Sequence, residues 1–369
     1  MQTLSTLPPL SVELKDKSYP IHFIEEGLSA LGPLLQKQLE PNSNAVLVTE
    51  RYIKETLELN WAPHNFFKNE FIAPPGEGSK SLRTLEHLYT ILSHAQLDRQ
   101  SALVALGGGV VGDLCGFAAA TYLRGIGYYQ IPTSLLAMVD SSVGGKTGIN
   151  LDAGKNLVGA FYHPKAVFIC PAFLKTLPEK EFSSGMAEVI KYGLLADLDL
   201  YTQLCEQDPL HPEHHALSEI IRRCCTIKAD IVMQDETETT TEGGRALLNL
   251  GHTFAHALEK VAGYGKYTHG EAVSIGLCLA MRLSELLGYI NEQALHTLKI
   301  LLEKYKLPTQ LRAPLKVSAL TAAMTQDKKA KHGNLRFITL KTIGQANIHS
   351  DIPSEWIEML WREVGAHAS

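Results

Sequence analysis

The chain has 369 residues, with 34 lysines and arginines against 39 aspartates and glutamates, for a formal charge of −5. Its 45% hydrophobic and 20% charged residues exclude a mainly disordered or fibrous protein, and its length predicts two domains. A mildly acidic chain without a long basic run is not expected to bind nucleic acid or an anionic membrane as its main task.

The N-terminal sequence and the cysteines indicate where the protein works. No basic segment followed by an apolar one opens the chain, and no run of about 18 residues is apolar enough to span a bilayer. The six cysteines are too sparse for a disulfide framework and form no C-x-x-C pair. We therefore expect a cytoplasmic protein with free thiols, in which histidines and carboxylates hold any metal.

In the first half of the chain, short apolar runs alternate with helical patterns. The runs are continuous, which is typical of parallel strands that are covered on both faces. We expect strands at Asn44–Glu50, Ser101–Leu106, Tyr128–Ile131 and Val167–Cys170, and helices at Ser81–Gln96 and Asp113–Leu123. Residues 1–178 are thus predicted to form an α/β domain with a mainly parallel sheet.

A glycine-rich turn joins one of these strands to the next helix. Gly107, Gly109 and Gly112 match G-x-G-x-x-G, a pattern that lets the backbone approach a pyrophosphate at a helix N-terminus. The turn follows roughly the third strand, and no acidic residue ends a strand some twenty residues later, so an ordinary Rossmann unit is disfavoured. Two alternatives stay open: a turn without a ligand, and a variant dinucleotide site in which Thr49 and Glu50 hold a ribose.

A second glycine-rich segment, DSSVGGKTGIN, spans residues 140–150. It ends like a Walker A motif, but Asp140 stands where that motif needs glycine, so a P-loop NTPase is disfavoured. Lys146 and Thr147 lie in this segment, and Lys155 and Asn156 follow it. We expect a loop that lines a pocket; the alternative is a solvated surface loop.

From about Pro178 onward the pattern becomes helical. Apolar residues at i, i+3 and i+4 predict helices at Ser184–Leu195, Leu217–Met233, Leu247–Val261, Glu271–Leu287 and Asn291–Tyr305. The segment Asn334–His349 is compatible with a β-hairpin. We place a helical domain at residues 179–369, with the boundary within Cys170–Ser184.

Histidines and a glutamate in this second half suggest a metal site. His252 and His256 are four residues apart on one helix face, and His269 opens the next helix. Glu188 lies three residues before Lys191 on a mostly apolar helix, where a carboxylate needs a partner. One glutamate and two histidines form a catalytic zinc set, although a Glu–Lys pair with scattered histidines is the alternative. Spacing does not decide between His252 and His256.

These motifs together resemble the 3-dehydroquinate synthases, sugar-phosphate cyclases that are related in fold to metal-dependent glycerol dehydrogenases. The resemblance extends from about Thr49 to Gly344 and includes PGEGSK, DSSVGGKTGIN with GKN, GMAEVIKYG, LLNLGHTFAHALE, HGEAV and DKK. It implies an N-terminal NAD-binding domain, a C-terminal helical domain that binds the metal and the substrate, an active site in the cleft between the two with one Zn²⁺ or Co²⁺ ion, and a homodimer.

The resemblance also assigns residues to these ligands. It implies that Glu188, His252 and His269 bind the metal. It implies NAD contacts at Glu77, Lys80, Gly109, Val110, Val111, Gly112, Asp113, Thr133, Ser134, Lys146, Lys155, Phe173, Leu174, Lys175 and Thr176. It implies substrate phosphate contacts at Lys146, Asn156, Asn249, His256, Lys328 and Arg124. Arg124 could act in its own subunit or be donated by a partner subunit.

The remaining implied contacts concern the carboxylate and ring hydroxyls of the substrate. Arg245 and Lys228 are expected to bind the carboxylate, since two parallel N–H bonds of Arg suit that group. The segment between them is about three residues longer than the family pattern, which weakens the assignment of Lys228. Asp140 and Lys191 are expected to position ring hydroxyls.

The implied substrate is 3-deoxy-D-arabino-heptulosonate 7-phosphate, which the family converts to 3-dehydroquinate and phosphate in the shikimate pathway. The implied steps are oxidation by NAD, phosphate elimination, reduction, ring opening and an intramolecular aldol closure. The metal acidifies a ring hydroxyl, and the protein holds both charged ends of the substrate. The alternatives are another sugar-phosphate cyclase and a metal-dependent NAD alcohol or glycerol dehydrogenase.

Overall fold

The computed structural model describes residues 8–39, 44–56, 67, 69–240, 243–330 and 335–368, without the side chains of 326–330. It divides into two compact units, one of Met1–Pro178 with His211–Met233 and one of Glu179–Leu210 with Gln234–Ser369. Helix α7 (Leu217–Gln234), which the sequence placed in the second domain, therefore groups with the first unit. Its apolar pattern shows that one face is buried, but not which core buries it.

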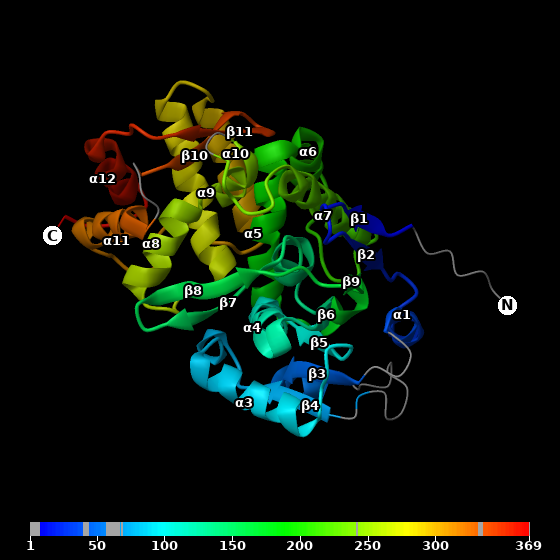
Figure 1. Ribbon diagram of the computed structural model, residues 1–369. Coiled ribbons are helices and arrows are strands. Elements are labelled where there is room, and N and C mark those ends of the chain that lie inside the picture. The colour runs from blue at the N-terminus through cyan, green and yellow to red at the C-terminus, as the bar shows by residue number, and fades with distance from the viewer. Residues whose placement is uncertain are drawn as a thin grey trace. The chain divides into compact units, whose positions relative to one another are not determined.

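The first unit is built on a seven-stranded sheet (Figure 1). The strand order is β1-β2-β9-β6-β5-β3-β4, and every pair is parallel except β1 with β2. The strands are β1 (Leu10–Val12), β2 (Tyr19–Phe23), β3 (Ala45–Glu50), β4 (Asn69–Ala73), β5 (Ala102–Gly107), β6 (Gly127–Pro132) and β9 (Ala166–Ile169). This pairing confirms the mainly parallel sheet that the continuous apolar runs predicted. The runs are continuous because strands such as β5 and β9 are buried along their whole length.

The helices of this unit are α1 (Leu31–Gln38), α2 (Arg51–Thr56), α3 (Leu82–His94) and α4 (Gly109–Thr121), together with α7. Of these, α2, α3 and α4 contact strands of the sheet. Val46, Leu88, Leu103 and Leu114 are fully buried in the core that α3 and α4 share with the strands. Ser81 caps α3, since its side chain accepts a hydrogen bond from the backbone N–H of Thr84.

The expected loop at residues 140–150 is only partly a loop. A π-helical turn, Ala137–Ser141, is followed by the antiparallel hairpin β7 (Lys146–Leu151) and β8 (Gly154–Phe161). The inner face of β7 packs against α4, where Ile149 is fully buried. The glycine and serine content of the segment hid this strand, because such residues have low strand propensity.

The second unit is mostly helical. Its helices are α5 (Glu179–Ala196), α6 (Leu198–Glu206), α8 (His252–Ala262), α9 (His269–Leu286), α10 (Glu292–Lys304), α11 (Val317–Ala330) and α12 (Ser354–Glu363). The predicted hairpin is confirmed as β10 (Phe337–Thr342) and β11 (Gln345–His349). The long buried helix α9 contacts α5, α8, α10, α12 and β10. Within the described part of the chain, no helix combines the length and apolarity needed to cross a membrane.

One expected helix is divided in the structure. The segment Leu247–Val261 begins as the end of a 3-10 helix, Gly244–Asn249, and continues as α8 only from His252. Gly251 lies between the two with φ of +78°, a left-handed conformation that ends one helix and lets another start. The break makes His252 the first residue of α8.

Candidate metal and cofactor sites

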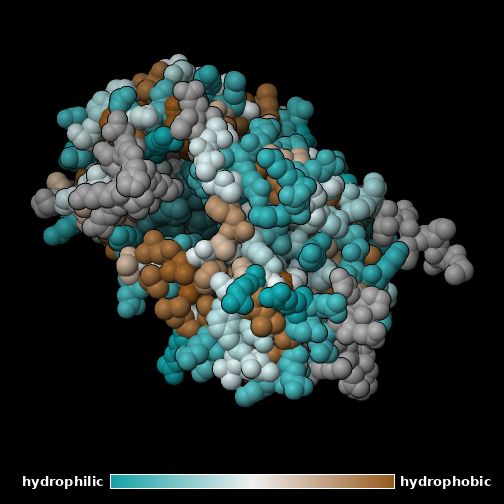
Figure 2. Space-filling model, viewed as in Figure 1, coloured by the Kyte–Doolittle hydropathy of each residue, from teal (hydrophilic) through white to brown (hydrophobic). Residues whose placement is uncertain are grey.

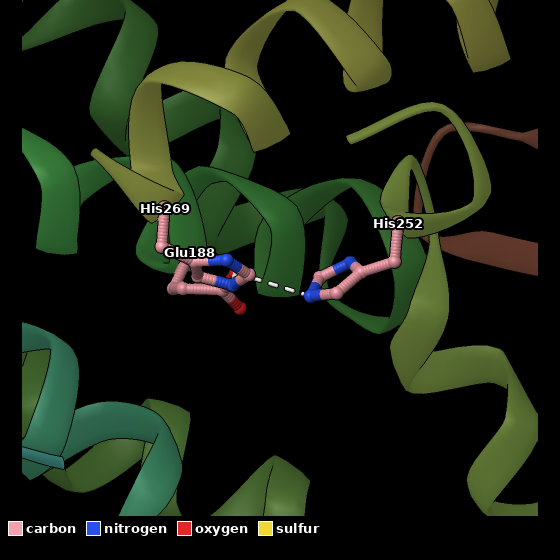
Figure 3. A group of neighbouring side chains, drawn as sticks. All are labelled: Glu188, His252 and His269. Atoms are coloured by element: carbon pink, nitrogen blue, oxygen red, sulfur yellow. Dashed lines mark ion pairs between the residues drawn. The ribbon is translucent and has the colours of Figure 1, made fainter. Parts of the chain in front are cut away.

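Three helices of the second unit bring a carboxylate and two imidazoles together. Glu188 lies in the middle of α5, His252 opens α8 and His269 opens α9. One ligand atom from each lies within 4.8 Å of the others. Among the described residues, this is the group of side chains whose geometry could hold a metal ion. Figure 3 shows both imidazole rings turned toward the carboxylate of Glu188. The metal set that the sequence suggested is therefore assembled in one place.

Glycine allows α9 to approach α5 closely enough for this geometry. A Cβ added at Gly270 would lie 2.5 Å from the Cα and 2.6 Å from the carbonyl carbon of Ser184, one turn before Glu188 on α5. The backbone N–H of Gly270 donates a hydrogen bond of 2.9 Å to the Ser184 hydroxyl. The contact fixes the start of α9, and with it His269, beside α5.

The distances within the group fit ligands of a common ion. Nε2 of His252 and Nε2 of His269 each lie 3.6 Å from Oε1 of Glu188. These separations are longer than good hydrogen bonds, and ligand atoms about 2.1 Å from a tetrahedral zinc ion lie roughly 3.4 Å apart. The donor set of one carboxylate and two imidazoles therefore fits a divalent zinc or cobalt ion.

The electrostatics differ between the two histidines. Burial and the charge of Lys191 lower the pKa of His252 to about 3, so its ring is neutral and can act as a ligand. Burial also acts to lower the pKa of His269, but Glu188 and Glu259 outweigh it and raise this pKa to about 10. Because a ligating imidazole must give up that proton, metal binding at neutral pH should release protons.

Lys191 and His256 border the group. Lys191 is 1% exposed and forms an ion pair with Oε2 of Glu188. The ring of His256 meets that of His252 edge-on, with centroids 5.5 Å apart, and it lies 6.5 Å from the ring of His269. The side chain of His256 is exposed, unlike the buried His252. The structure thus gives the two histidines of α8 different environments that helical spacing did not distinguish.

Arg245 and Asn249 lie in the 3-10 helix Gly244–Asn249, which follows the segment that is longer than the family pattern. The Asp235 carboxylate accepts hydrogen bonds from the backbone N–H groups of Thr239, Thr240 and Arg245. Arg245 is 2% exposed, and its Nη1 donates to the carbonyl of Glu236 at 2.7 Å. The Asn249 amide donates to Glu238 Oε1 at 3.2 Å. Lys328 belongs to α11, and its side chain lies outside the described residues.

The first unit gathers the residues that the resemblance assigned to NAD. Glu77 and Lys80 follow β4, the glycine turn follows β5, and Thr133 and Ser134 follow β6. The segment Phe173–Thr176 follows β9. All lie at the carboxyl ends of parallel strands, which share one edge of the sheet and commonly bind ligands there.

Strand order explains why the glycine turn does not follow the first strand of the sheet. The chain moves from β3 outward to β4 and then returns to β5 on the other side of β3. The reversal lies between β3 and β5, and nucleotide sites form at such reversals. Thr49 links the ends of β3 and β5 at this reversal, since its hydroxyl donates a hydrogen bond to the carbonyl of Leu106 at 2.8 Å. The edge of the sheet therefore fits a dinucleotide.

A buried lysine anchors this edge. Lys80 is 3% exposed and donates to Asp113 Oδ2 at 2.7 Å and to Asn156 Oδ1. Burial acts to lower the pKa of Lys80, but Asp113 and Glu77 outweigh it and raise the pKa. Asn150 joins the network through its amide, which donates to Glu77 Oε1 at 2.9 Å. A hydrogen bond thus joins Lys80, which the resemblance assigned to NAD, to Asn156, which it assigned to the substrate phosphate.

The expected phosphate contacts of the first unit lie on the β7–β8 hairpin and beyond α4. Lys146 pairs with Phe161 at one end of the hairpin, whereas Lys155 and Asn156 begin β8 at the other. At about 3.3 Å per residue, the backbones of Lys146 and Asn156 are roughly 13 Å apart along the hairpin. Arg124 is exposed and has a φ of +69°.

Lys228 and Asp140 are joined in the first unit. Nζ of Lys228 donates to the backbone carbonyl of Asp140 at 2.7 Å and to its Oδ1 at 2.8 Å. Lys228 is 6% exposed, so this pair replaces much of its hydration. The sequence assigned the two residues to different groups of the substrate, and the structure places them side by side.

Sequence reasoning missed Glu259 and Asp235. Glu259 lies on α8, seven residues after His252, and its Oε2 is 3.6 Å from Nδ1 of His269. The i, i+4, i+7 spacing of His252, His256 and Glu259 was a readable signal, because it places all three on one helix face. Asp235 carried no such signal, since a carboxylate before a polar loop is common.

Comparison with known proteins agrees with these features. Residues 70–184 match the family model described as 3-dehydroquinate synthase N-terminal, and residues 185–330 match 3-dehydroquinate synthase C-terminal. A 3-dehydroquinate synthase of Opitutus terrae is 46% identical over 97% of this chain and 99% of its own. One of Synechocystis is 44% identical over 96% of this chain and 98% of its own.

Solved structures with the same fold are more distant in sequence. A 2-deoxy-scyllo-inosose synthase, complexed with carbaglucose-6-phosphate, NAD⁺ and Co²⁺, has a TM-score of 0.84 and 24% identity over 96% of this chain and 100% of its own. A 2-epi-5-epi-valiolone synthase from Streptomyces hygroscopicus with NAD⁺ and Zn²⁺ has a TM-score of 0.85 and 24% identity over 95% and 98%. An NADH-dependent butanol dehydrogenase from Thermotoga maritima has a TM-score of 0.65 and 14% identity over 96% and 98%.

Proposed function

The chain belongs to the 3-dehydroquinate synthase family, and on this premise we propose that it converts 3-deoxy-D-arabino-heptulosonate 7-phosphate to 3-dehydroquinate and phosphate. The observation that carries the proposal is the group of Glu188, His252 and His269, whose ligand atoms lie within 4.8 Å of one another. Lys191 compensates the charge of Glu188, but it does not explain why two imidazoles from separate helices also point to the same carboxylate; a shared metal ion does.

These three residues would hold one Zn²⁺ or Co²⁺ ion. When bound, such an ion lowers the pKa of a coordinated hydroxyl and so makes the adjoining carbon easier to oxidise. Within the chain, Lys191 compensates the charge of Glu188, and we assign to it a hydrogen bond to a substrate hydroxyl. We assign the same positioning role to Asp140, which Lys228 holds in place in the first unit.

The first unit is proposed to bind NAD. The N-terminus of α4 begins at Gly109 and offers backbone N–H groups and the positive end of the helix dipole to a pyrophosphate. Gly108, the N-cap residue, contributes no side chain to occupy this position. NAD held there would supply a hydride acceptor and donor for the cycle, so that net turnover would consume no oxidant. Residues 1–178 would thus form the NAD-binding domain, with the metal and most of the proposed substrate contacts in residues 179–369.

Basic and amide side chains are proposed to hold the two charged ends of the substrate. Lys146, Asn156, Asn249, His256, Lys328 and Arg124 are assigned to the phosphate, and Arg245 and Lys228 to the carboxylate. The exposure of Lys146 and His256 supports their part, because an incoming anion reaches them without displacing packed side chains. The buried Arg245 is held by Glu236 in one orientation, which favours a planar carboxylate partner.

We also propose that the protein is a homodimer and cytoplasmic. Figure 2 shows a hydrophobic patch over the β7–β8 hairpin, where Leu151, Leu157 and Phe161 are 36–54% exposed. Contiguous apolar side chains of this size commonly form an interface, and a second copy would cover them and bring in its own Arg124. The six free thiols fit a reducing compartment. Light scattering on the wild type and on Leu157→Lys tests the dimer: a monomeric wild type would contradict it.

The activity has a direct assay. The purified protein, a divalent metal and a catalytic amount of NAD should release inorganic phosphate from the heptulosonate phosphate in many turnovers, with no net NADH. Stoichiometric NADH from a sugar alcohol, without phosphate release, would instead identify the alcohol dehydrogenase alternative. Phosphate release from a sugar phosphate that lacks a carboxylate would indicate another cyclase, since Arg245 and Lys228 would then have no role.

A further inference from the structure

Helix α8 carries a third polar residue on the face that bears its two histidines. Glu259 follows His252 by seven residues and His256 by three, which places it on the same side of the helix. The side chain is buried, with 7% of the residue exposed. A carboxylate in such a position has a cost that specific partners must offset, and the structure shows one of them.

That partner is the ring of His269. Oε2 of Glu259 lies 3.6 Å from Nδ1 of His269, while the other ring nitrogen, Nε2, lies 3.6 Å from Oε1 of Glu188. The imidazole is therefore bracketed by two carboxylates, one at each nitrogen. A neutral ring has a single proton, and if Glu259 accepts it at Nδ1, the lone pair of Nε2 points to the position between Glu188 and His252.

His252 has a comparable arrangement with a different acceptor. Its Nδ1 lies 3.2 Å from the backbone carbonyl of Leu250, which leaves Nε2 directed at Glu188. Both histidines thus present Nε2 to the same point, and each has an oxygen acceptor behind Nδ1. The acceptor for His252 is neutral, whereas the acceptor for His269 is a charged carboxylate.

The backbone of residue 269 is already held by the start of α9. Thr268 and Glu271 form a capping box, in which Glu271 accepts from the N–H of Thr268 at 2.7 Å and Thr268 accepts from the N–H of Glu271 at 3.2 Å. Arg312 pairs with Glu271, and its own backbone N–H donates to the hydroxyl of Tyr267 at 2.9 Å. With the backbone fixed, rotation of the imidazole is the remaining freedom, and Glu259 contacts that ring.

We infer that Glu259 is the positioning residue of His269: it holds the ring with Nδ1 protonated and Nε2 directed at the metal. The inference rests on the proposed metal site and deepens it, because it assigns a residue that acts on the ion through another residue. Carboxylates behind ligating histidines commonly fix the ring and strengthen the ligand, and their removal typically weakens metal binding about 10- to 100-fold.

The test compares zinc affinity, by competition with a chromophoric chelator, in the wild type, Glu259→Gln, Glu259→Asp and Glu285→Gln. Glu285 is the matched control, since it is a half-buried carboxylate paired with Arg282 sixteen residues along α9 from His269. We expect about 10-fold or greater loss in Glu259→Gln, partial recovery in Glu259→Asp, and wild-type affinity in Glu285→Gln. The visible spectrum of the Co²⁺-loaded protein should shift in Glu259→Gln, because the ligand field depends on the ring orientation.

The outcomes separate the inference from the proposed function. Unchanged affinity and an unchanged cobalt spectrum in Glu259→Gln would overturn the positioning role while leaving the metal site intact. A wild type that binds no ion would refute the metal site itself. If Glu259→Gln loses affinity only in proportion to a lower melting temperature of the chelated protein, with the same cobalt spectrum, the role of Glu259 is structural and the inference is overturned.

Discussion

Replacing Gly270 by alanine tests how the metal group is assembled. The added Cβ would overlap the carbonyl oxygen of Ser184 and lie 2.5 Å from its Cα, whereas real Cβ contacts below 3.0 Å essentially never occur, so α5 and α9 must separate by more than 0.5 Å. The neighbouring atoms of Ser184 are all backbone, and they cannot move without α5. Overpacking of this kind costs about 1–3 kcal/mol. Loss of the hydrogen bond from Gly270 N–H to Ser184 adds about 1 kcal/mol.

An opposing effect is smaller. Alanine is favoured over glycine in a helix by about 0.5–1 kcal/mol, so the net destabilisation should be about 2 kcal/mol. In a unit of this size that corresponds to a melting temperature lower by about 4–8 °C. Because His269 is adjacent to Gly270 and Glu188 is one turn from Ser184, the same separation should reduce the metal content of the purified protein.

Calorimetry of the chelated protein and metal analysis of the purified protein check this expectation. Two variants serve as controls. Ser184→Ala removes the hydrogen bond without forcing the helices apart and should retain the metal. Gly127→Ala, whose added Cβ would meet its nearest neighbour at 3.6 Å, should resemble the wild type. If Gly270→Ala and Ser184→Ala had equal effects on stability and metal content, the overpacking argument would be wrong.

Three further predictions concern the metal, the substrate and pH. His269→Ala should abolish turnover and metal retention, and a mutant that stays fully active after chelation would refute the metal assignment. Lys146→Ala should weaken binding of the phosphorylated substrate far more than binding of a dephosphorylated analogue, as measured by calorimetric titration; equal losses would remove its phosphate role. Asp235→Asn should destabilise the protein above about pH 4, with the difference from the wild type shrinking below it, in denaturant titrations at several pH values. Burial acts to raise the pKa of Asp235, but its backbone N–H bonds outweigh it and lower this pKa, so the stabilisation is present above the unfolded pKa and is lost in acid; a pH-independent difference would contradict this.

The local elements of the fold were largely readable from the sequence. The runs that became β3, β5, β6 and β9 are continuous and apolar because those strands are covered on both faces, and this signal is local. The same holds for α9, whose apolar residues are close in sequence. β7 was missed, because its burial against α4 is a tertiary property of a glycine-rich segment.

The candidate site divides in the same way. The sequence by itself determined which residues could ligate a metal, since residue type and helical spacing identify Glu188 and the histidines of α8 and α9. Only the tertiary structure decided that His252 faces Glu188 while His256 stays exposed, because the break at Gly251 sets where α8 begins. It also decided that Glu259 stands behind His269. Contacts between helices depend on the approach of whole backbones, here permitted by the absence of a side chain at Gly270, and no local pattern records that distance.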